Sequence, residues 1–492
     1  MIPVLRNRSS GILLHLSSLP NPYGIGTFGK EAYDFVDFLK KAGQTYWQIL
    51  PLNPVAEGNS PYSTYSAFAL NPYFIDLDLL KKDELLQESD YQHLDFGSDP
   101  TKVDYVKITQ NKMNILMLAY ENRKAKSLDG WNSFVATNRE WIDNYAAFMS
   151  IRSYFNDSLQ NWDAEVKRKN AAFYSLLEKD EVDFWIFLQY LCQKQWMSLK
   201  KYANDQGIHI FGDMPIYVSG DSADVWANPE VFDVDADLQP LHVAGCPPDD
   251  FAVDGQRWGM PVFQWDFLIK NDFAWWMKRL KRNLQLYDCM RIDHFRGLES
   301  FYSIPAGEPT ARNGRWVKAC GREFFAKIKE QFGDVDIILE DLGFITQEVM
   351  DLKKYTGFPG MKVLQFAFLS DANNPYLPHH CERNSVIYTS SHDNDTLLGW
   401  FSHASEYEKR FLTSYLGTSA EDDIVWACIE KVMSAESMLS IIPLQDFLQL
   451  DSEARMNIPG TTYGNWVWRV QREAFDSELA QKIHETTKKY NR

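Results

Sequence analysis

Four carboxylates lie at or directly after short aliphatic runs, where buried parallel strands deliver side chains to one rim of a fold. They are Asp213, Asp293, Glu340 and Asp393. Because side chains alternate along a strand, Arg291 and Asp293 in the segment RIDHFRG point the same way and can pair. A guanidinium beside Asp293 would lower the pKa of its carboxyl and keep it an anion, as a nucleophile requires. A purely structural Arg–Asp pair is the alternative interpretation.

Glu340 follows three aliphatic residues in the segment IILEDLG. A carboxyl there that faces a cleft is poorly solvated, so its pKa should rise, which suits a proton donor near neutral pH. The alternative is a helix N-cap, for which Asp341 is well suited. Asp393, in the segment SSHDNDT, brings a third carboxylate to the same rim, although a capped turn that includes Asp395 would use the same residues.

Enzymes that cleave glycosidic bonds typically use two carboxyl groups whose pKa values are shifted in opposite directions. At a separation of about 5–5.5 Å one carboxylate attacks the sugar and the anomeric configuration is retained, whereas a wider gap admits water and inverts it. The sequence does not give this separation, so the residues alone leave both outcomes open.

Eight short segments rich in β-branched and aliphatic residues are typical of buried parallel strands. They span residues 11–17, 46–52, 208–217, 288–295, 336–341, 362–368, 385–391 and 438–446. Between the first two, apolar residues from Ala32 to Leu39 follow helical spacing, and Gly43 stands where a helix commonly ends. This alternation predicts an α/β fold, a (β/α)8 TIM barrel with its active site at the strand C-termini. A doubly wound open sheet would show the same alternation.

Long segments follow the second and third predicted strands. We expect residues 78–205 to form an inserted helical subdomain and residues 218–286 to form a loop-rich subdomain that covers the active-site cleft. No internal repeat or Ser/Gly linker interrupts the chain. Residues 1–492 are therefore predicted to be a single catalytic barrel domain with these large helical and loop insertions.

Composition narrows the classes of function. The 492 residues are 45% hydrophobic, which is enough for a large core and excludes intrinsic disorder. The net charge of −17 argues against nucleic acid or an anionic membrane as a partner. The apolar stretch near the N-terminus is too short for an export signal, and six scattered cysteines indicate a reduced, cytoplasmic chain. Nothing in the sequence indicates the oligomeric state.

Two short motifs suggest a cofactor or a metal, and both are rejected. Residues 24–29, GIGTFG, match a dinucleotide-binding pattern, but Pro20 and Pro22 separate them from the strand, and the next strand ends without a ribose-binding acid. Residues 233–237 open like an EF-hand loop that lacks its later Gly and Glu. The first strand carries a single His15, so a metal-dependent barrel hydrolase has little support. We expect no cofactor and no metal.

The motifs RIDHFRG, ILEDLG and SSHDNDT resemble those of the α-amylase-type glycosidase clan. With SPYSTYSAFALNP (60–72), GDMPIYV (212–218), PPDDFAVDGQRWGMP (247–261) and MNIPGTTYGNW (456–466), the chain is similar nearly end to end to glycoside hydrolase family 77, the 4-α-glucanotransferases or amylomaltases. The resemblance implies transfer of an α-1,4-glucan segment from a maltooligosaccharide to the 4-OH of another glucan or of glucose. It also implies a retaining mechanism with a covalent glucosyl–Asp intermediate. A glucan hydrolase of the same clan and a non-catalytic glucan-binding barrel are the alternatives.

The resemblance further implies roles for individual residues. Asp293 matches the nucleophile, Glu340 the general acid/base, and Asp393 the carboxylate that stabilises an oxocarbenium-like transition state. Substrate-contacting positions are matched by Ser60, Tyr62, Asp213, Asp249, Phe251, Trp258, Arg291, His294, His392 and Asn465. This chain has Asp250 where relatives carry an aromatic residue next to Phe251, a difference that bears on acceptor preference and on the making of large cyclic glucans.

Overall fold

The computed structural model describes residues 5, 7–248, 252–419 and 423–492. Within these residues, eight parallel strands close into a barrel in the order β1-β12-β11-β10-β9-β6-β3-β2. The strands are β1 (Ser9–Leu13), β2 (Tyr46–Gln48), β3 (His209–Met214), β6 (Cys289–Ile292), β9 (Ile337–Leu339), β10 (Gly360–Val363), β11 (Ser385–Tyr388) and β12 (Leu439–Pro443). Each overlaps one of the predicted segments, so the (β/α)8 barrel is confirmed. An open sheet is excluded because β1 pairs with both β2 and β12.

Most of the strands end several residues earlier than predicted. Asp293 and Glu340 come directly after β6 and β9, respectively, and lie outside the regular sheet. The polar residues at the strand ends therefore belong to the loops at the rim, where active-site groups of this architecture gather.

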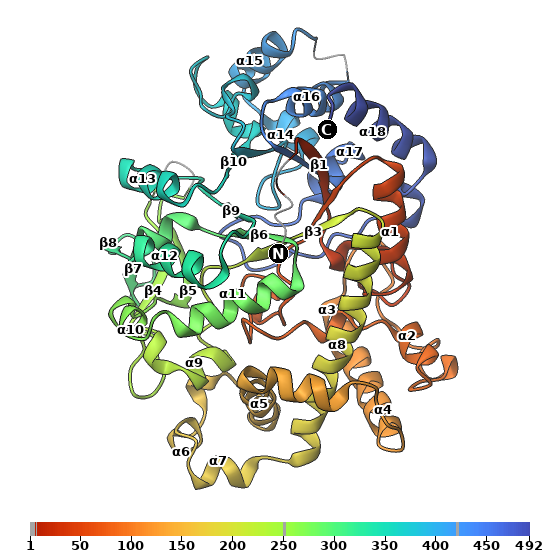
Figure 1. Ribbon diagram of the computed structural model, residues 1–492, viewed down its shortest axis with the longest axis vertical. Helices are drawn as coiled ribbons and strands as arrows, with labels where there is room; N and C mark the ends of the chain where they lie inside the picture. The colour runs from red at the N-terminus through yellow and green to blue at the C-terminus, as the bar shows by residue number, and fades with distance from the viewer. Residues whose placement is uncertain (1–4, 6, 249–251, 420–422) are drawn as a thin grey trace.

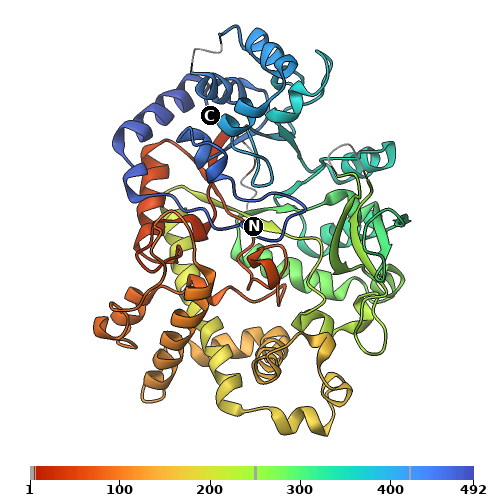
Figure 2. The same cartoon turned by 180° about the vertical axis from the view of Figure 1, so that it is seen from behind.

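Helices surround the barrel on its outside (Figures 1 and 2). They include α1 (Lys30–Lys41), α11 (Ala274–Leu286), α12 (Gly321–Phe332), α13 (Gln347–Thr356), α16 (Ile424–Ser434) and α18 (Ser477–Lys489). In α1 the predicted apolar face is buried from Ala32 to Leu39. Gly43 follows the helix with a φ of 68°, the left-handed conformation that favours glycine at this position.

The segment between β2 and β3 forms a layer of helices. It contains α2 (Leu77–Lys82), α4 (Met113–Arg123), α5 (Trp131–Phe155) and α8 (Lys179–Asp205), and α5 packs against α8. In Figure 1 this layer lies at the lower end of the molecule, and α8 runs from it back to the barrel.

The segment 218–286 holds more regular structure than its loop-like sequence suggests. It contains α9 (Ala223–Ala227), α10 (Trp265–Lys270) and the strands β4 (His242–Cys246) and β5 (Gln256–Pro261). With β7 (Ser300–Pro305) and β8 (Arg315–Lys318) these strands form an antiparallel sheet of order β5-β4-β7-β8. Since β7 and β8 follow β6, a further excursion after the fourth barrel strand completes this sheet. The sequence analysis missed it because the pairing joins segments that are far apart along the chain.

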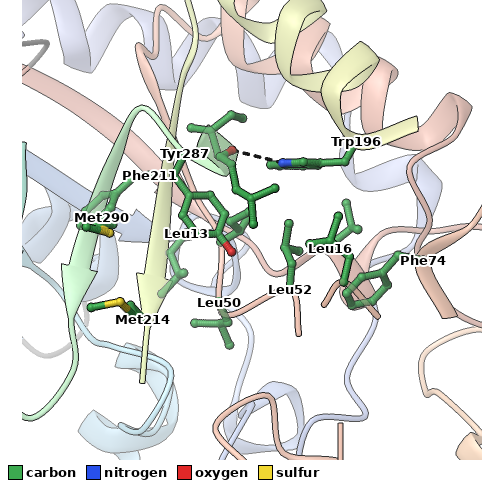
Figure 3. Packing of buried hydrophobic residues seen from close by; sticks show 14 of the residues in the cluster. Leu13, Leu16, Leu50, Leu52, Phe74, Trp196, Phe211, Met214, Tyr287 and Met290 are labelled. Carbon is green, nitrogen blue, oxygen red and sulfur yellow. Dashed lines mark hydrogen bonds between the residues drawn. The ribbon is translucent and has the colours of Figure 1, made fainter. Parts of the chain in front are cut away.

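Side chains between the barrel and its helices form the main core (Figure 3). At Gly212 in β3, a Cβ atom would lie 2.1 Å from Cγ of Tyr287, whose ring is buried in this layer. The neighbouring Trp196 is held by its indole N–H, which donates to the carbonyl of Leu286 at 3.1 Å. The ring of Tyr287 thus packs directly on the backbone beside Asp213, so this part of the core positions the rim.

Replacing Gly212 by Ala should destabilise the protein by about 1–3 kcal/mol, because the new methyl group overlaps a ring that has no room to move. Denaturant unfolding followed by circular dichroism measures this change. Gly307→Ala is the matched control, since a Cβ there meets no atom within 4 Å. Equal unfolding midpoints for the two variants would contradict this account of the core.

Candidate active site

Asp293 and Glu340 leave the barrel side by side. Strands β6 and β9 pair in the register Ile292↔Leu339, and the two acids are the residues that directly follow these strand ends. The backbone N–H of Glu340 donates to the carbonyl of Ile292 at 3.0 Å, and the N–H of Phe295 donates to the carbonyl of Glu340 at 3.1 Å. Because neighbouring strands lie about 4.8 Å apart, the two carboxyl side chains start from backbones at that spacing.

Arg291 holds the nucleophile candidate in place. Its Nη2 donates to Oδ1 of Asp293 at 2.6 Å, and its Nη1 donates to Oδ2 of Asp213 at 2.5 Å. Arg291 and Asp213 are direct partners across β6 and β3, and both are buried. The hydroxyl of Tyr62 donates to the same Asp213 oxygen at 2.6 Å. The predicted Arg291–Asp293 pair is thus confirmed, and it belongs to a longer chain of buried contacts.

The expected lowering of the Asp293 pKa is wrong. Burial raises the pKa of Asp293 to about 6, and the negative charges of Asp213 and Asp393 add to this effect, although Arg291 opposes it. A carboxylate that is mostly removed from water loses more solvation than one shared guanidinium returns. The pair with Arg291 orients the carboxyl without making it a strong acid.

Burial also raises the pKa of Glu340 well above its usual range, as predicted, and the charges of Asp293 and Asp341 act in the same direction. Two adjacent carboxyl groups do not ionise independently and tend to share one proton. Since Arg291 contacts Asp293 directly, the negative charge is favoured on Asp293 and the proton on Glu340. This distribution of charge is the one that the predicted roles of nucleophile and proton donor require, and the roles themselves stay predictions.

Asp393, after β11, has the opposite electrostatics. Burial alone would raise its pKa, but the charge of His392 and hydrogen bonds from His392 and Asn457 outweigh burial and hold the pKa of Asp393 below its usual range. The amide of Asn457 donates to Oδ1 of Asp393 at 2.7 Å, and Arg455 donates to its backbone carbonyl at 2.7 Å. Asp393 therefore stays an anion in the site.

Asn457 and Arg455 are site residues that the sequence analysis missed. Asn457 stands inside the segment MNIPGTTYGNW, which carried part of the family resemblance, but nothing in its local spacing links it to Asp393. Only the folded chain brings together residues 64 positions apart.

Aromatic rings lie beside these carboxylates at the rim of the barrel. The rings of Tyr62 and His392 are stacked with centroids 5.1 Å apart, and Trp466 packs beside both. Trp258, on β5, meets the ring of His294 edge-on at 4.8 Å. The antiparallel sheet thereby contributes one wall of the site.

His294 has three features that are typical of a functional site. Burial, and then the charges of Arg296 and Arg291, lower the pKa of His294 to about 4, so the imidazole is neutral near pH 7. Its Nε2 is buried and has no hydrogen-bond partner among the described residues. Its φ of 45° is a left-handed conformation that non-glycine residues rarely adopt, and such strain is concentrated at functional sites.

Of the other predicted site residues, Ser60 and Asn465 make hydrogen bonds within their own loops. Ser60 accepts a hydrogen bond from the backbone N–H of Tyr62 at 3.2 Å and so shapes the loop that carries it. The buried amide of Asn465 accepts from the N–H of Ile458 and donates to the carbonyl of Thr461, so the structure places it inside its own loop. Asp249 and Phe251, together with Asp250, lie outside the described residues.

Asp341 and Asp395 have structural partners. Asp341 accepts from Nζ of Lys353 at 2.6 Å and from the N–H of Met361 at 2.7 Å, which ties the end of β9 to β10. It does not cap α13, which begins after Thr346. Asp395 accepts from the hydroxyl of Ser452 at 2.7 Å.

The glycine motif at residues 24–29 does not form a phosphate cradle. A Cβ atom at Gly29 would lie 1.9 Å from the carboxylate of Asp76, so an acid occupies the place beside the helix start. Among the described residues no three His, Cys, Asp or Glu side chains gather as a group that could hold a metal ion. Within the same residues, every helix is too short or too polar to span a membrane.

Comparison with known proteins assigns the chain to a family. The family described as 4-alpha-glucanotransferase matches residues 14–474. The chain is 47% identical over 485 residues to the 4-alpha-glucanotransferase of Clostridium butyricum, which covers 97% of this chain and 100% of that protein. The chain belongs to the 4-alpha-glucanotransferase family. Its similarity to the 4-alpha-glucanotransferase of Thermus thermophilus is 45% identity over 479 residues, or 94% of this chain and 95% of that one.

A solved structure of the same family agrees with this assignment. Amylomaltase from Streptococcus agalactiae, solved in complex with acarbose, superposes with a TM-score of 0.96 at 40% identity, with 99% of each chain covered. The predictions of family, barrel fold and glucanotransferase activity are therefore confirmed.

If Asp293 is the nucleophile, the transfer rate should fall as the pH drops through about 6, because protonation removes its anion. Activity should be present above this pKa and fall again at high pH, when Glu340 loses its proton. Initial rates of maltotriose disproportionation in constant-ionic-strength buffers give the profile. A rate that stays constant down to about pH 4 would contradict the raised pKa of Asp293.

Replacing Asn457 by Ala should lower kcat roughly tenfold, because a hydrogen bond to a charged carboxylate is lost and the pKa of Asp393 rises. Asn384→Ala is the matched control, since its amide donates to the carbonyl of Gly357 and Asn384 precedes β11 at the other end of the barrel. Steady-state kinetics with both variants test the contact, and equal kcat values would exclude a role for Asn457.

Proposed function

We propose that Asp293, Glu340 and Asp393 carry out a retaining double displacement on α-1,4-glucans. In the first step a carboxylate oxygen of Asp293 attacks the anomeric carbon of the donor while its glycosidic bond breaks. The leaving oxygen takes the proton of Glu340. The products are a glucosyl ester on Asp293 and a shortened glucan with a free 4-OH.

The second step reverses the first with a new acceptor. Glu340, now a carboxylate, takes the proton of the acceptor 4-OH as that oxygen attacks the anomeric carbon. The ester bond breaks and Asp293 leaves as a carboxylate. No water is consumed, so the number of glycosidic bonds and of reducing ends is unchanged.

The observation that carries this proposal is the placement of Asp293 and Glu340 at equivalent positions of adjacent strands. Their backbones start about 4.8 Å apart, which is the scale of the 5–5.5 Å carboxyl separation of retaining enzymes. The wider gap of an inverting pair would require the side chains to diverge.

The surroundings suit a sugar ring at this point. Asp393 is an anion that can accept hydrogen bonds from sugar hydroxyls or balance positive charge at the anomeric carbon, while His294 offers an unpaired ring nitrogen. Tyr62 and Trp258 supply ring faces for contact with the sugar. The related amylomaltase that was solved with acarbose supports maltooligosaccharides as ligands of this chain.

Transfer must outrun hydrolysis of the ester, so water has to be kept from the intermediate. We assign this task to the segments 78–205 and 218–286, as a helical subdomain and a second subdomain that covers the cleft. The protein is also proposed to work in the reducing cytoplasm, in keeping with its six free cysteines.

Incubation with maltotriose tests the proposal. The protein should yield glucose and longer chains with almost no gain in reducing ends, and EDTA should leave the rate unchanged. A steady gain in reducing ends would instead indicate a hydrolase.

Asp293→Ala should abolish transfer and still bind maltooligosaccharides. Asp288→Asn is the matched control at the opposite end of β6, where Asp288 accepts from Asn204 and from the N–H of Ile210. It should lose stability and keep the transfer activity. Transfer by Asp293→Ala would overturn the assignment of the nucleophile, and a wild-type protein that binds glucans without transfer would indicate a non-catalytic barrel.

A further inference from the structure

The loop between Asn457 and Trp466 is joined to the active site at both ends. At its start, the amide of Asn457 donates to Oδ1 of Asp393 at 2.7 Å. At its end, the ring of Trp466 lies with its centroid 5.8 Å from that of Tyr62 and 6.0 Å from that of His392. The loop is therefore held in place against Asp393, Tyr62 and His392.

The loop is also closed on itself. The side chain of Asn465 accepts from the N–H of Ile458 at 2.9 Å and donates to the carbonyl of Thr461 at 3.0 Å. The N–H of Trp466 donates to the carbonyl of Met456 at 2.7 Å, which joins the two ends. The amide of Asn465 thus holds the shape of the loop, while its predicted contact with sugar stays a prediction.

What the loop presents to solvent is an aromatic ring. Tyr463 is 87% exposed, more than any other large hydrophobic side chain among the described residues. Its neighbour Thr462 lies against the loop that carries Ser60 and Tyr62, since a Cβ at Gly58 would be 3.5 Å from the carbonyl of Thr462. Tyr463 thus stands where two loops of the active-site rim meet.

We propose that Tyr463 forms a subsite outside the reacting glucose and stacks against a glucosyl unit of the α-1,4-glucan chain. The proposal rests on the function proposed above. Two residues lie between Tyr463 and Trp466, so their Cα atoms are three steps along the chain and at most about 11 Å apart, a distance that a few linked glucosyl units span. A flat phenol ring on a rigid mount stacks on a sugar face with little loss of conformational entropy.

The experiment compares chain lengths. Transfer is measured for Tyr463→Ala with donors of increasing length and glucose as acceptor, and with acceptors of increasing length and one fixed donor. We expect kcat/KM to fall about three- to tenfold for the longer chains of one series, with the shortest substrates unchanged. Loss in the donor series places the subsite on the donor side, and loss in the acceptor series places it on the acceptor side; either result supports the proposal.

Two further variants separate stacking from a structural role. Tyr463→Phe keeps the ring and should restore the rate with long chains. Tyr174→Ala removes a ring that is 66% exposed on α7 (Ala171–Leu176), in the helical layer, and should leave every rate unchanged. A loss for Tyr463→Ala that is equal at all chain lengths, or no loss at all, would overturn the proposal.

Binding provides a readout that does not need the proposed chemistry. Calorimetric titration of maltoheptaose into Asp293→Ala, with and without Tyr463→Ala, should show a three- to tenfold weaker Kd in the double variant. Equal Kd values would overturn the stacking subsite even if transfer is confirmed. If the wild type fails to transfer, the proposed function fails, and the titration still decides the role of Tyr463.

Discussion

The buried guanidinium of Arg291 is the interaction on which the rest of the site depends. It is held between Asp213 and Asp293, and thereby joins β3 to the end of β6. Removing an arginine from water is costly unless its N–H groups are paired with anions, and here two carboxylates provide that pairing. The same contacts fix the side chain of Asp293, the proposed nucleophile. The ion pair is thus a positioning device, and burial sets the proton affinity of Asp293.

A second buried carboxylate supports the other side of the site. Asp446, after β12, accepts from the hydroxyls of Thr389 and Ser390 at 2.6 and 2.7 Å and from the N–H of Leu397 at 2.7 Å. These residues flank the turn that carries His392 and Asp393. Asp393 itself receives donors from the loop after β12, so it is a stable anion a few strands away from Asp293 and Glu340, whose pKa values are raised by burial. One barrel rim thereby keeps acids in different protonation states at the same pH.

The segments inserted between the barrel strands supply aromatic side chains to the site. The antiparallel sheet brings Trp258 against His294, and the loop from Asn457 to Trp466 brings the ring of Trp466 against His392. These rings are flat and uncharged, so they suit contact with a neutral sugar. The overall charge of −17 does not describe this part of the site. The acidic character of the chain concerns its surface, whereas the proposed chemistry rests on a few carboxylates with specific neighbours.

The sequence by itself determined the barrel and the acids at its rim. Buried parallel strands are short aliphatic runs, and their C-terminal residues share one rim, so Asp293, Glu340 and Asp393 were found from local pattern and family motifs. Tertiary structure decided the solvation and the hydrogen-bond partners of these groups, which the local sequence pattern does not contain. Burial reversed the expected pKa shift of Asp293, the loop turned Asn465 inward, and Asn457 reached Asp393 across 64 residues. Strand periodicity depends on neighbours along the chain, whereas solvation and hydrogen-bond partners depend on which distant segments pack around a group, and only the closed barrel with its excursions sets those.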